Sequence, residues 1–305
     1  MPRCARIKPL DSMFHVMVRS ISEIKLFRTD NDKIKYFNFV KKYQNIYRFK
    51  VYAYCLMGNH GHFIIDANGA DISKFMHGIN LSYAKYFNKV HKRHGHLFQD
   101  RFKSKVVNDE MYFYTLSAYI HNNPSDLKGY RNRVEEYNFS SLSVYLDLKN
   151  DQFEILDYNF IHSMFGLSMF NPDINYLGFV NKCTKLEFKK KIEFSDESSE
   201  YISCRTPLLR NFEENLVIDF VSQKTNINKQ MLHAKHNRAS VNSRAILALL
   251  MRCFCDSKCN DICKALGNIT QARASSLTKL GQKLVSENNE YRGIVEEFIE
   301  KYSSR

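Results

Sequence analysis

The chain of 305 residues has no tryptophan, only 5 prolines and 11 glycines, and no apolar run near the roughly 18 residues that a membrane-spanning helix needs. Its 44% hydrophobic content excludes a disordered or fibrous protein and allows two compact domains. The N-terminus "MPRCARIKPLDSMF" lacks the apolar core of a secretory signal. We therefore expect a cytoplasmic protein with no membrane partner.

Acidic residues are also scarce, with 32 Asp and Glu against 45 Lys and Arg, which gives a formal net charge of +13. The chain adds 18 Tyr and 23 Phe. Cations mixed with aromatic rings favour a polyanion with exposed bases, namely nucleic acid. A solvated basic surface without a nucleic-acid partner is the alternative.

The eight cysteines include no Cys-x-x-Cys pair, so a disulfide framework is not indicated. Cys255, Cys259 and Cys263 have helical spacing, which suits either a metal site or small thiols buried on a packed helix. We favour buried, reduced thiols.

The first half of the chain alternates strand and helix patterns. We expect strands over 12–20, 49–57, 61–67 and 96–107, and helices over 32–47, 71–95 and 108–124. Asn108 or Asp109 would cap the last helix and Pro124 would end it. Strands and helices without a strict repeat favour an α+β class with a mainly antiparallel sheet.

Patterns weaken between about 130 and 210, where 193–207 reads as an exposed linker. From Val221 to Cys255 there is no Asp or Glu, and the basic residues are Lys224, Lys229, Lys235, Arg238, Arg244 and Arg252. Helices are predicted over 243–254, 257–268 and 270–284, with Gly267 ending the second. This order favours a helix-turn-helix, and a helical bundle without a nucleic-acid role is the alternative.

The segment "CLMGNHGHFIIDANG" places His60 and His62 one residue apart on a predicted strand, so both imidazoles would point to one sheet face. Such a pair suits a divalent metal, although stacked structural histidines would look the same. Tyr119 and Asn123 lie four residues apart on one helical face. They would serve as nucleophile and amide ligand, or as a core aromatic and a helix-ending residue.

Three segments in order, "MGNHGHFII", "GHLFQDRFKSK" and "AYIHNNP", resemble the HUH single-strand transposases, most closely the REP-associated tyrosine transposases of the IS200-like type. The opening "SMFHVMVRS" and the later "YNFSS" extend the resemblance over about residues 1–145. It implies a ferredoxin-like HUH domain with a central sheet flanked by helices. Position 61, usually bulky and apolar in the family, is glycine here, on the strand face away from the metal.

The resemblance implies metal ligands at His60, His62 and Asn123 and a nucleophile at Tyr119. The expected reaction cleaves single-stranded or hairpin DNA through a 5′-phosphotyrosine link. Imidazole and oxygen ligands favour Mg²⁺ or Mn²⁺. Candidate DNA contacts cluster between residues 83 and 105, where Asp100 is the one acid: Lys85, Lys89, Lys92, Arg93, Gln99, Arg101, Lys103 and Lys105.

Residues 216–284 resemble the DNA-binding domain of the DnaA replication initiator, best over "NINKQMLHAKHNRASVNSRAILALLMR". The initiator's Arg-Asp-His cluster is replaced by "NITQAR". The resemblance therefore implies duplex binding but not the initiator's sequence preference. The candidate contacts are Arg238, Arg244, Arg273, Ser276 and Lys279.

We thus expect a catalytic domain over 1–150, a connecting region over 151–210 and a helical DNA-binding domain over 211–300. The expected protein is a nucleoid-associated monomer or homodimer that cleaves and transfers DNA strands with a metal. The alternatives are a domesticated DNA-binding regulator or architectural protein without turnover, and a replication or relaxase-type nickase.

Overall fold

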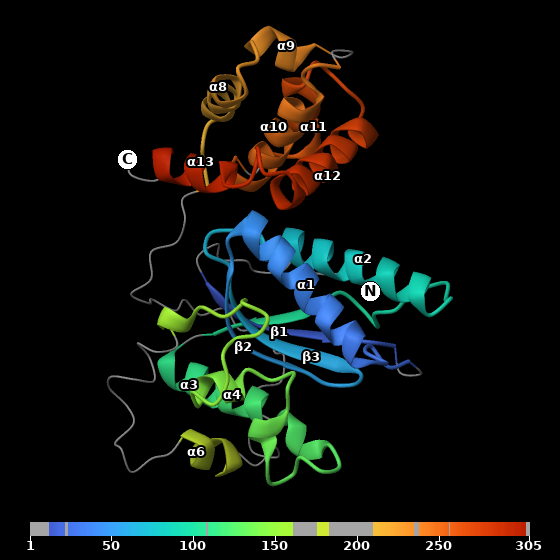
Figure 1. The fold of residues 1–305 in the computed structure, drawn as a ribbon, viewed down its shortest axis with the longest axis vertical. Coiled ribbons are helices and arrows are strands. Elements are labelled where there is room, and N and C mark those ends of the chain that lie inside the picture. The colour runs from blue at the N-terminus through green and yellow to red at the C-terminus, as the bar shows by residue number, and fades with distance from the viewer. Residues whose placement is uncertain are drawn as a thin grey trace. The chain divides into compact units, whose positions relative to one another are not determined.

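The computed structural model describes residues 12–21, 24–107, 109–160, 176–182, 210–234, 238–255 and 257–302. Backbone contacts divide the chain into two compact units, Met1–Thr206 and Pro207–Arg305, here called unit 1 and unit 2. Unit 1 contains a sheet with helices, whereas the described part of unit 2 consists of helices and their connections (Figure 1). The predicted linker over 193–207 and Lys235 lie outside the described residues.

An antiparallel sheet forms the centre of unit 1. Its strands are β1 (Met13–Arg19), β2 (Lys50–Leu56), β3 (His60–Asp66) and β4 (Lys103–Val106), in the spatial order β2-β3-β1-β4. Every neighbouring pair runs antiparallel, which confirms the predicted α+β class with its mainly antiparallel sheet. Since β3 is hydrogen-bonded along both edges, the side chains that it carries have a rigid base.

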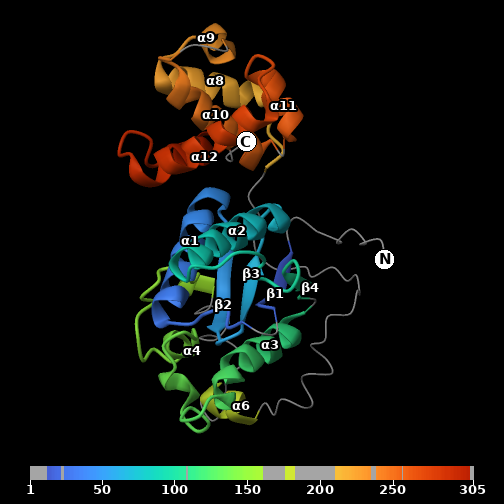
Figure 2. The same ribbon diagram turned by 90° about the vertical axis from the view of Figure 1, so that its right-hand side faces the viewer.

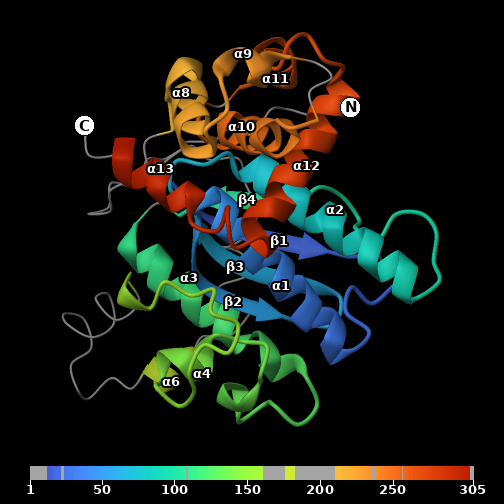
Figure 3. The same cartoon turned by 45° about the horizontal axis from the view of Figure 1, so that its top comes forward.

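Helices cover both faces of this sheet (Figures 2 and 3). On one face α1 (Asp30–Tyr47) packs against α2 (Ile72–Val90), and on the other α3 (Glu110–Asn122) contacts β2 and β3. All residues of β2 and β3 except the first of each strand are buried, as expected for strands covered on both faces.

Local sequence signals explain where these helices begin. Thr29 and Asp32 form a reciprocal capping box at the start of α1, and the Asp71 carboxylate accepts the Ser73 N–H at the start of α2. An apolar stripe along α2 is buried in full: Ile72, Phe75, Met76, Ile79, Tyr83 and Phe87.

Helix α3 begins after its predicted cap, Asp109, and ends two residues before the predicted end at Pro124. Asp109 Oδ1 accepts the Tyr112 N–H at 2.6 Å, and the α-helix ends at Asn122. A 3₁₀ turn, η1 (Asn123–Asp126), follows, with Pro124 in its first turn, where a missing N–H costs little.

Three short elements close unit 1 over the outer side of α3: η2 (Val134–Glu136), α4 (Leu142–Tyr145) and α6 (Tyr176–Lys182). Ala118 of α3 packs with Val134, Leu142 and Val180 in a small apolar cluster. The buried His121 of α3 joins them through its ring nitrogens. Nδ1 lies 2.8 Å from the Tyr176 hydroxyl and Nε2 2.8 Å from Ser141 Oγ.

The prediction of a continuous strand over 96–107 is wrong for its first part, because only β4 (Lys103–Val106) is a strand. Residues 97–99 lie beside the end of β1 and pair with the chain there at one isolated bridge, between Ser20 and Phe98. Asp100 then accepts the Arg101 N–H with Oδ1 at 2.7 Å, a local bond that competes with strand pairing.

Unit 2 is built around α10 (Val241–Phe254), whose residues are almost all buried. Helices α11 (Cys259–Ala265) and α12 (Gln271–Glu287) follow, which confirms the three predicted helices; α8 (Glu214–Thr225), α9 (Lys229–His233) and α13 (Ile294–Tyr302) complete the set. Gly281 lets α12 approach α10 closely, since a Cβ there would lie 2.3 Å from the Ala245 carbonyl oxygen.

The cysteines of the described residues, Cys55, Cys253, Cys255, Cys259 and Cys263, are free thiols. Of the three cysteines for which burial was favoured, only Cys263 is buried, whereas Cys255 and Cys259 are half-buried. Among the described helices, none combines the length and the apolar character needed to cross a membrane.

Candidate functional site

The two histidines of the His-x-His pair lie on the same face of β3. Their ring centroids are 5.1 Å apart with the rings nearly perpendicular. His62 is 4% exposed and pairs across the sheet with Met17 and Cys55, while the half-buried His60 pairs with Arg19 at the end of β1. The predicted arrangement of two imidazoles on one sheet face is therefore present.

Tyr119 of α3 lies next to the histidine pair of β3. Its ring meets the His62 ring edge to face, with centroids 5.7 Å apart. Burial, with a smaller contribution from Asp126, raises the pKa of Tyr119 above its ordinary value of 10.0. Because the phenol is neutral near pH 7, a nucleophilic role requires a cation or a base near its oxygen.

Asn123 stands one turn after Tyr119 and is 4% exposed. Its Nδ2 donates to the backbone oxygens of Tyr119 at 2.9 Å and Ile120 at 3.2 Å. The amide nitrogen is thus directed at the helix end, and Oδ1 is the atom that would bind a cation. Asn123 also fixes the last turn of the helix that carries Tyr119.

A third histidine, His15 of β1, was not predicted at this site. Its Nε2 lies 3.0 Å from His62 Nδ1, and the two rings stack with centroids 5.2 Å apart. Burial, together with the Lys105 charge, lowers the pKa of His15 to about 3, so this imidazole is neutral near pH 7. The sequence signal was its place in "SMFHVMVRS", but the contact becomes visible only with the β1–β3 register.

His60 and His62 each have a partner at Nδ1. His62 Nδ1 lies beside His15 Nε2, and His60 Nδ1 lies 2.7 Å from Asn59 Oδ1. Metal-binding histidines in proteins commonly donate one ring N–H to a second group, which leaves the other nitrogen to the metal. The described residues contain no group of three or more His, Cys, Asp and Glu that could hold a metal. His60, His62 and the Asn123 amide oxygen fit a divalent cation that accepts imidazole and oxygen ligands.

Gly61 points to the other face of β3, toward the interior. A Cβ at this position would lie 2.6 Å from Leu56 Cδ2 and 3.4 Å from Val18 Cγ2. The side chains of Leu56 and Val18 therefore fill the space that a bulky residue would need. The departure from the HUH pattern concerns core packing and leaves the histidine face unchanged.

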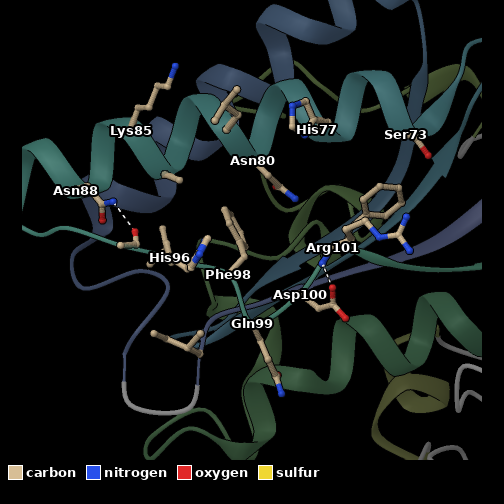
Figure 4. A pocket seen from close by; sticks show the side chains of 16 residues that line it. Ser73, His77, Asn80, Lys85, Asn88, His96, Phe98, Gln99, Asp100 and Arg101 are labelled. Atoms are coloured by element: carbon tan, nitrogen blue, oxygen red, sulfur yellow. Dashed lines mark hydrogen bonds between the residues drawn. The ribbon is translucent and has the colours of Figure 1, made fainter. Parts of the chain in front are cut away.

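Most of the residues predicted to contact DNA in unit 1 are at the surface: Lys85, Lys89, Lys92, Gln99, Arg101 and Lys103 are exposed. Arg93 and Lys105 are half-buried, with Arg93 6.0 Å from the Phe87 ring centroid and Lys105 5.4 Å from that of Tyr112. Lys85, Gln99 and Arg101 line one groove beside α2 (Figure 4).

Arg244 of unit 2, predicted as a DNA contact, is buried. It is 1% exposed, and its Nη2 donates to the Leu266 carbonyl oxygen at 2.8 Å, at the end of α11. A buried guanidinium that holds a helix end is not placed to enter a groove of DNA, so the predicted contact at Arg244 is wrong. Its role is structural, joining α10 to α11.

The other predicted contacts of unit 2 are accessible. Arg273, Ser276 and Lys279 lie on one exposed side of α12, opposite the side that packs on α10, and Arg238 is exposed before α10. The acid-free stretch is partly neutralised by acids from other segments. Lys224 pairs with Glu297 at 2.5 Å, and Lys229 pairs with Asp219.

Comparison with known proteins gives two matches. The family described as "Transposase IS200 like" matches residues 10–123. The solved structure of a REP-associated tyrosine transposase bound to a REP hairpin matches with 18% identity and a TM-score of 0.40, over 48% of this chain and 86% of that chain. No curated protein matches.

The family match begins before β1 and ends at Asn123. It confirms the resemblance predicted for this segment, whereas the helix-turn-helix of unit 2 stays a prediction. Through residues 10–123, which carry His60, His62 and Tyr119, this chain is similar to the IS200-like transposases.

Proposed function

We propose that unit 1 is a metal-dependent tyrosine transposase that cleaves and transfers single-stranded or hairpin DNA through a 5′-phosphotyrosine intermediate. The observation that carries this proposal is the meeting of His60 and His62 on β3 with Tyr119 on α3. The histidine pair and the tyrosine are more than 50 residues apart in the chain, and they meet where α3 packs against β3. The match to IS200-like transposases covers all of these residues.

His60, His62 and Asn123 Oδ1 would hold the cation, with Mg²⁺ or Mn²⁺ preferred for the ligand set. When bound, the cation would neutralise charge on a phosphate and orient it for in-line attack. His15 and Asn59 would hold the two imidazoles from behind. A proton on His62 Nδ1, donated to His15 Nε2, leaves Nε2 of His62 with the lone pair that a ligand needs.

Tyr119 is the proposed nucleophile. Its phenolate oxygen attacks phosphorus, a new phosphorus–oxygen bond forms to the tyrosine, and the bond to the 3′ oxygen of the preceding nucleotide breaks. The departing oxygen takes a proton and becomes a free 3′ hydroxyl, while the phenol proton passes to solvent. Attack by a 3′ hydroxyl on the phosphotyrosine reverses these steps, so rejoining needs no external energy.

Unit 2 would supply binding to duplex DNA. The support is the exposed side of α12, which presents Arg273, Ser276 and Lys279 in successive turns, next to the short helix α11. A helix with exposed cations and a hydroxyl suits phosphate and base-edge contacts in the major groove.

The test of this proposal is the covalent adduct. Tyr119→Phe should remove all tyrosine-linked DNA while leaving hairpin binding within about twofold, since only the attacking oxygen is lost. Tyr112→Phe is the matched control on the same helix, because burial raises the pKa of Tyr112 to about 12 and its hydroxyl is buried. Denaturing gels and peptide mapping of the adduct measure both variants.

An adduct that persists in Tyr119→Phe would place the nucleophile elsewhere, with Tyr112, Tyr114 and Tyr130 the next to substitute. If neither the wild type nor any variant forms an adduct while hairpin binding is intact, the protein is a DNA-binding regulator rather than a transferase.

A further inference from the structure

A groove of about 900 Å³ lies between α2 and residues 95–102 of unit 1 (Figure 4). We call it the α2 groove. Its size is in the range of sites that enclose a small organic ligand, and one nucleotide fits such a volume. Nothing in the proposed strand-transfer chemistry uses this groove.

The wall formed by residues 95–102 is fixed on both sides. Asn88 of α2 donates from Nδ2 to the Gly95 carbonyl oxygen at 2.9 Å (Figure 4). On the sheet side, Phe98 forms a bridge with Ser20, and the Gln99 N–H donates to the Arg19 carbonyl oxygen at 3.0 Å. The groove is therefore formed before any ligand enters, which lowers the entropy cost of binding.

The interior of the groove offers an aromatic ring and apolar surface. The Phe98 ring points from the wall toward α2 (Figure 4). Leu81 of α2, another lining residue, is 42% exposed, so its apolar surface is accessible to a ligand in the groove. An aromatic ring beside exposed apolar surface suits a flat, partly apolar ligand such as a nucleobase.

One polar group in the groove has a fixed orientation. The Tyr36 hydroxyl donates to Asn80 Oδ1 at 3.0 Å, which assigns the amide oxygen to the helix interior. Asn80 Nδ2 then points into the groove (Figure 4). This N–H donor would meet a carbonyl or ring nitrogen acceptor on a base edge.

The charges around the groove favour a phosphate. Lys85 and Arg101 stand among its lining residues, and Lys89 lies one turn beyond Lys85 on α2. Asp100 is the one acid in the lining, and it already accepts the Arg101 N–H. A nucleotide would thus place its base against Phe98 and its phosphate near the cations.

We propose that the α2 groove binds an unpaired nucleotide of the DNA substrate, with the base against Phe98 and Leu81. This inference rests on the proposed function, because it assigns a second contact to the same strand. The wall is bonded to Arg19, which is the strand partner of His60. Two strand spacings, about 10 Å, separate the wall backbone from that of the first proposed ligand.

The test separates base contacts from phosphate contacts and needs no known target sequence. Two probes with equal phosphate number are used in EDTA, which prevents cleavage: a 12-nucleotide oligothymidine and a 12-residue abasic strand. Wild type should bind the oligothymidine at least about tenfold more tightly. Phe98→Leu should reduce this ratio about fivefold or more, by weakening oligothymidine binding alone. Leu148→Ala, at a 61% exposed leucine outside the groove, is the control and should keep the wild-type ratio.

A second measurement covers the case in which Phe98→Leu folds poorly. Wild type is irradiated with a 12-nucleotide strand containing 5-iododeoxyuridine, and the crosslinked peptides are identified by mass spectrometry. Crosslinks within residues 77–102 support the proposal. Crosslinks confined to other segments, or equal weakening of both probes by Phe98→Leu, would overturn it.

The two proposals fail in different ways. If Phe98→Leu lowers the probe ratio but no adduct forms at Tyr119, the strand-transferase proposal is wrong and the nucleotide site stands. If an adduct forms at Tyr119 but Phe98→Leu leaves the probe ratio unchanged, the nucleotide site is wrong and the strand-transferase proposal stands.

Discussion

At the residue scale, the histidine face of β3 is the feature on which metal binding depends. His62→Ala should lower Mn²⁺ affinity at least about 100-fold and abolish cleavage, because a missing imidazole leaves two of the three proposed ligands. Isothermal titration with Mn²⁺ measures this, with His233→Ala, an exposed histidine of α9, as control.

Chelation should stop cleavage by wild type, and added Mg²⁺ or Mn²⁺ should restore cleavage by wild type but not by His62→Ala. Full cleavage in a chelator would rule out the metal.

His15 should act through His62. His15→Phe keeps the ring volume but removes the nitrogen 3.0 Å from His62 Nδ1, and Mn²⁺ affinity should fall about 10- to 100-fold. His15→Gln places an amide near the lost Nε2 and should recover most of this loss. Long-range nitrogen–proton spectra should show a changed tautomer of His62 in the Phe variant only. Equal affinities for wild type and both variants would make His15 a packing residue.

The sequence predicted the residues whose geometry is local. The period of a strand places His60 and His62 on one face, and the period of a helix places Tyr119 and Asn123 on another. His15 was missed because its contact requires the register between β1 and β3, which pairs His15 with Ile64 and leaves His62 on the diagonal. Arg244 was misassigned because a basic residue at a helix start looks the same whether it faces solvent or a neighbouring helix end.

At the scale of elements, the packing of α3 against α4 and α6 should make unit 1 sensitive to acid. Burial lowers the pKa of His121 to about 3, whereas in the unfolded chain it is near 6.5. The unfolded state therefore takes up this proton first, so the contribution is complete above pH 6.5 and is lost as the pH falls toward 3.

His121→Gln should remove this part of the pH dependence. Between pH 7 and pH 4.5 the free energy of unfolding of wild type should fall by about 2 to 3 kcal/mol more than that of the variant. Urea-dependent hydrogen exchange of α3 peptides measures unit 1 apart from unit 2. Equal losses in the two proteins would mean that the buried imidazole is not a major acid-sensitive group of unit 1.

Elements with strong periodicity were predicted well, and those set by tertiary contacts were not. The apolar stripe of α2 and the Asp109 cap of α3 are signals within the sequence itself. The strand expected over 96–107 is shortened because Asp100 bonds locally and β1 ends near Arg19, which removes the pairing partner. Helices α9 and α4 are too short to carry a periodic signal and exist through packing.

At the scale of the whole molecule, the two units should divide the substrate. A chain ending at Thr206 keeps every strand and helix of unit 1. It should bind a hairpin with a long duplex stem more weakly than the full chain, with a smaller salt slope, because the cations of α12 are gone. Cleavage of a short single strand at saturating concentration should be unchanged within about twofold.

Salt titrations of both chains, beside single-turnover cleavage, measure this division. The doubly substituted full chain Arg273→Ala, Lys279→Ala is the matched comparison, since it keeps unit 2 folded while removing two charges. If stem binding and its salt slope are the same in all three proteins, unit 2 does not bind duplex DNA and a protein partner would be sought for it.

Because the two units belong to one chain, DNA binding by one unit would change how often the other unit meets the same DNA. If unit 2 holds a duplex stem, as proposed, the single strand beside it meets unit 1 at an effective concentration on the order of millimolar. A catalytic unit with only micromolar affinity for single strands would then be nearly saturated beside a bound stem and nearly empty elsewhere. Tethering would thus restrict cleavage to strands next to the right duplex, without high affinity in the active site itself.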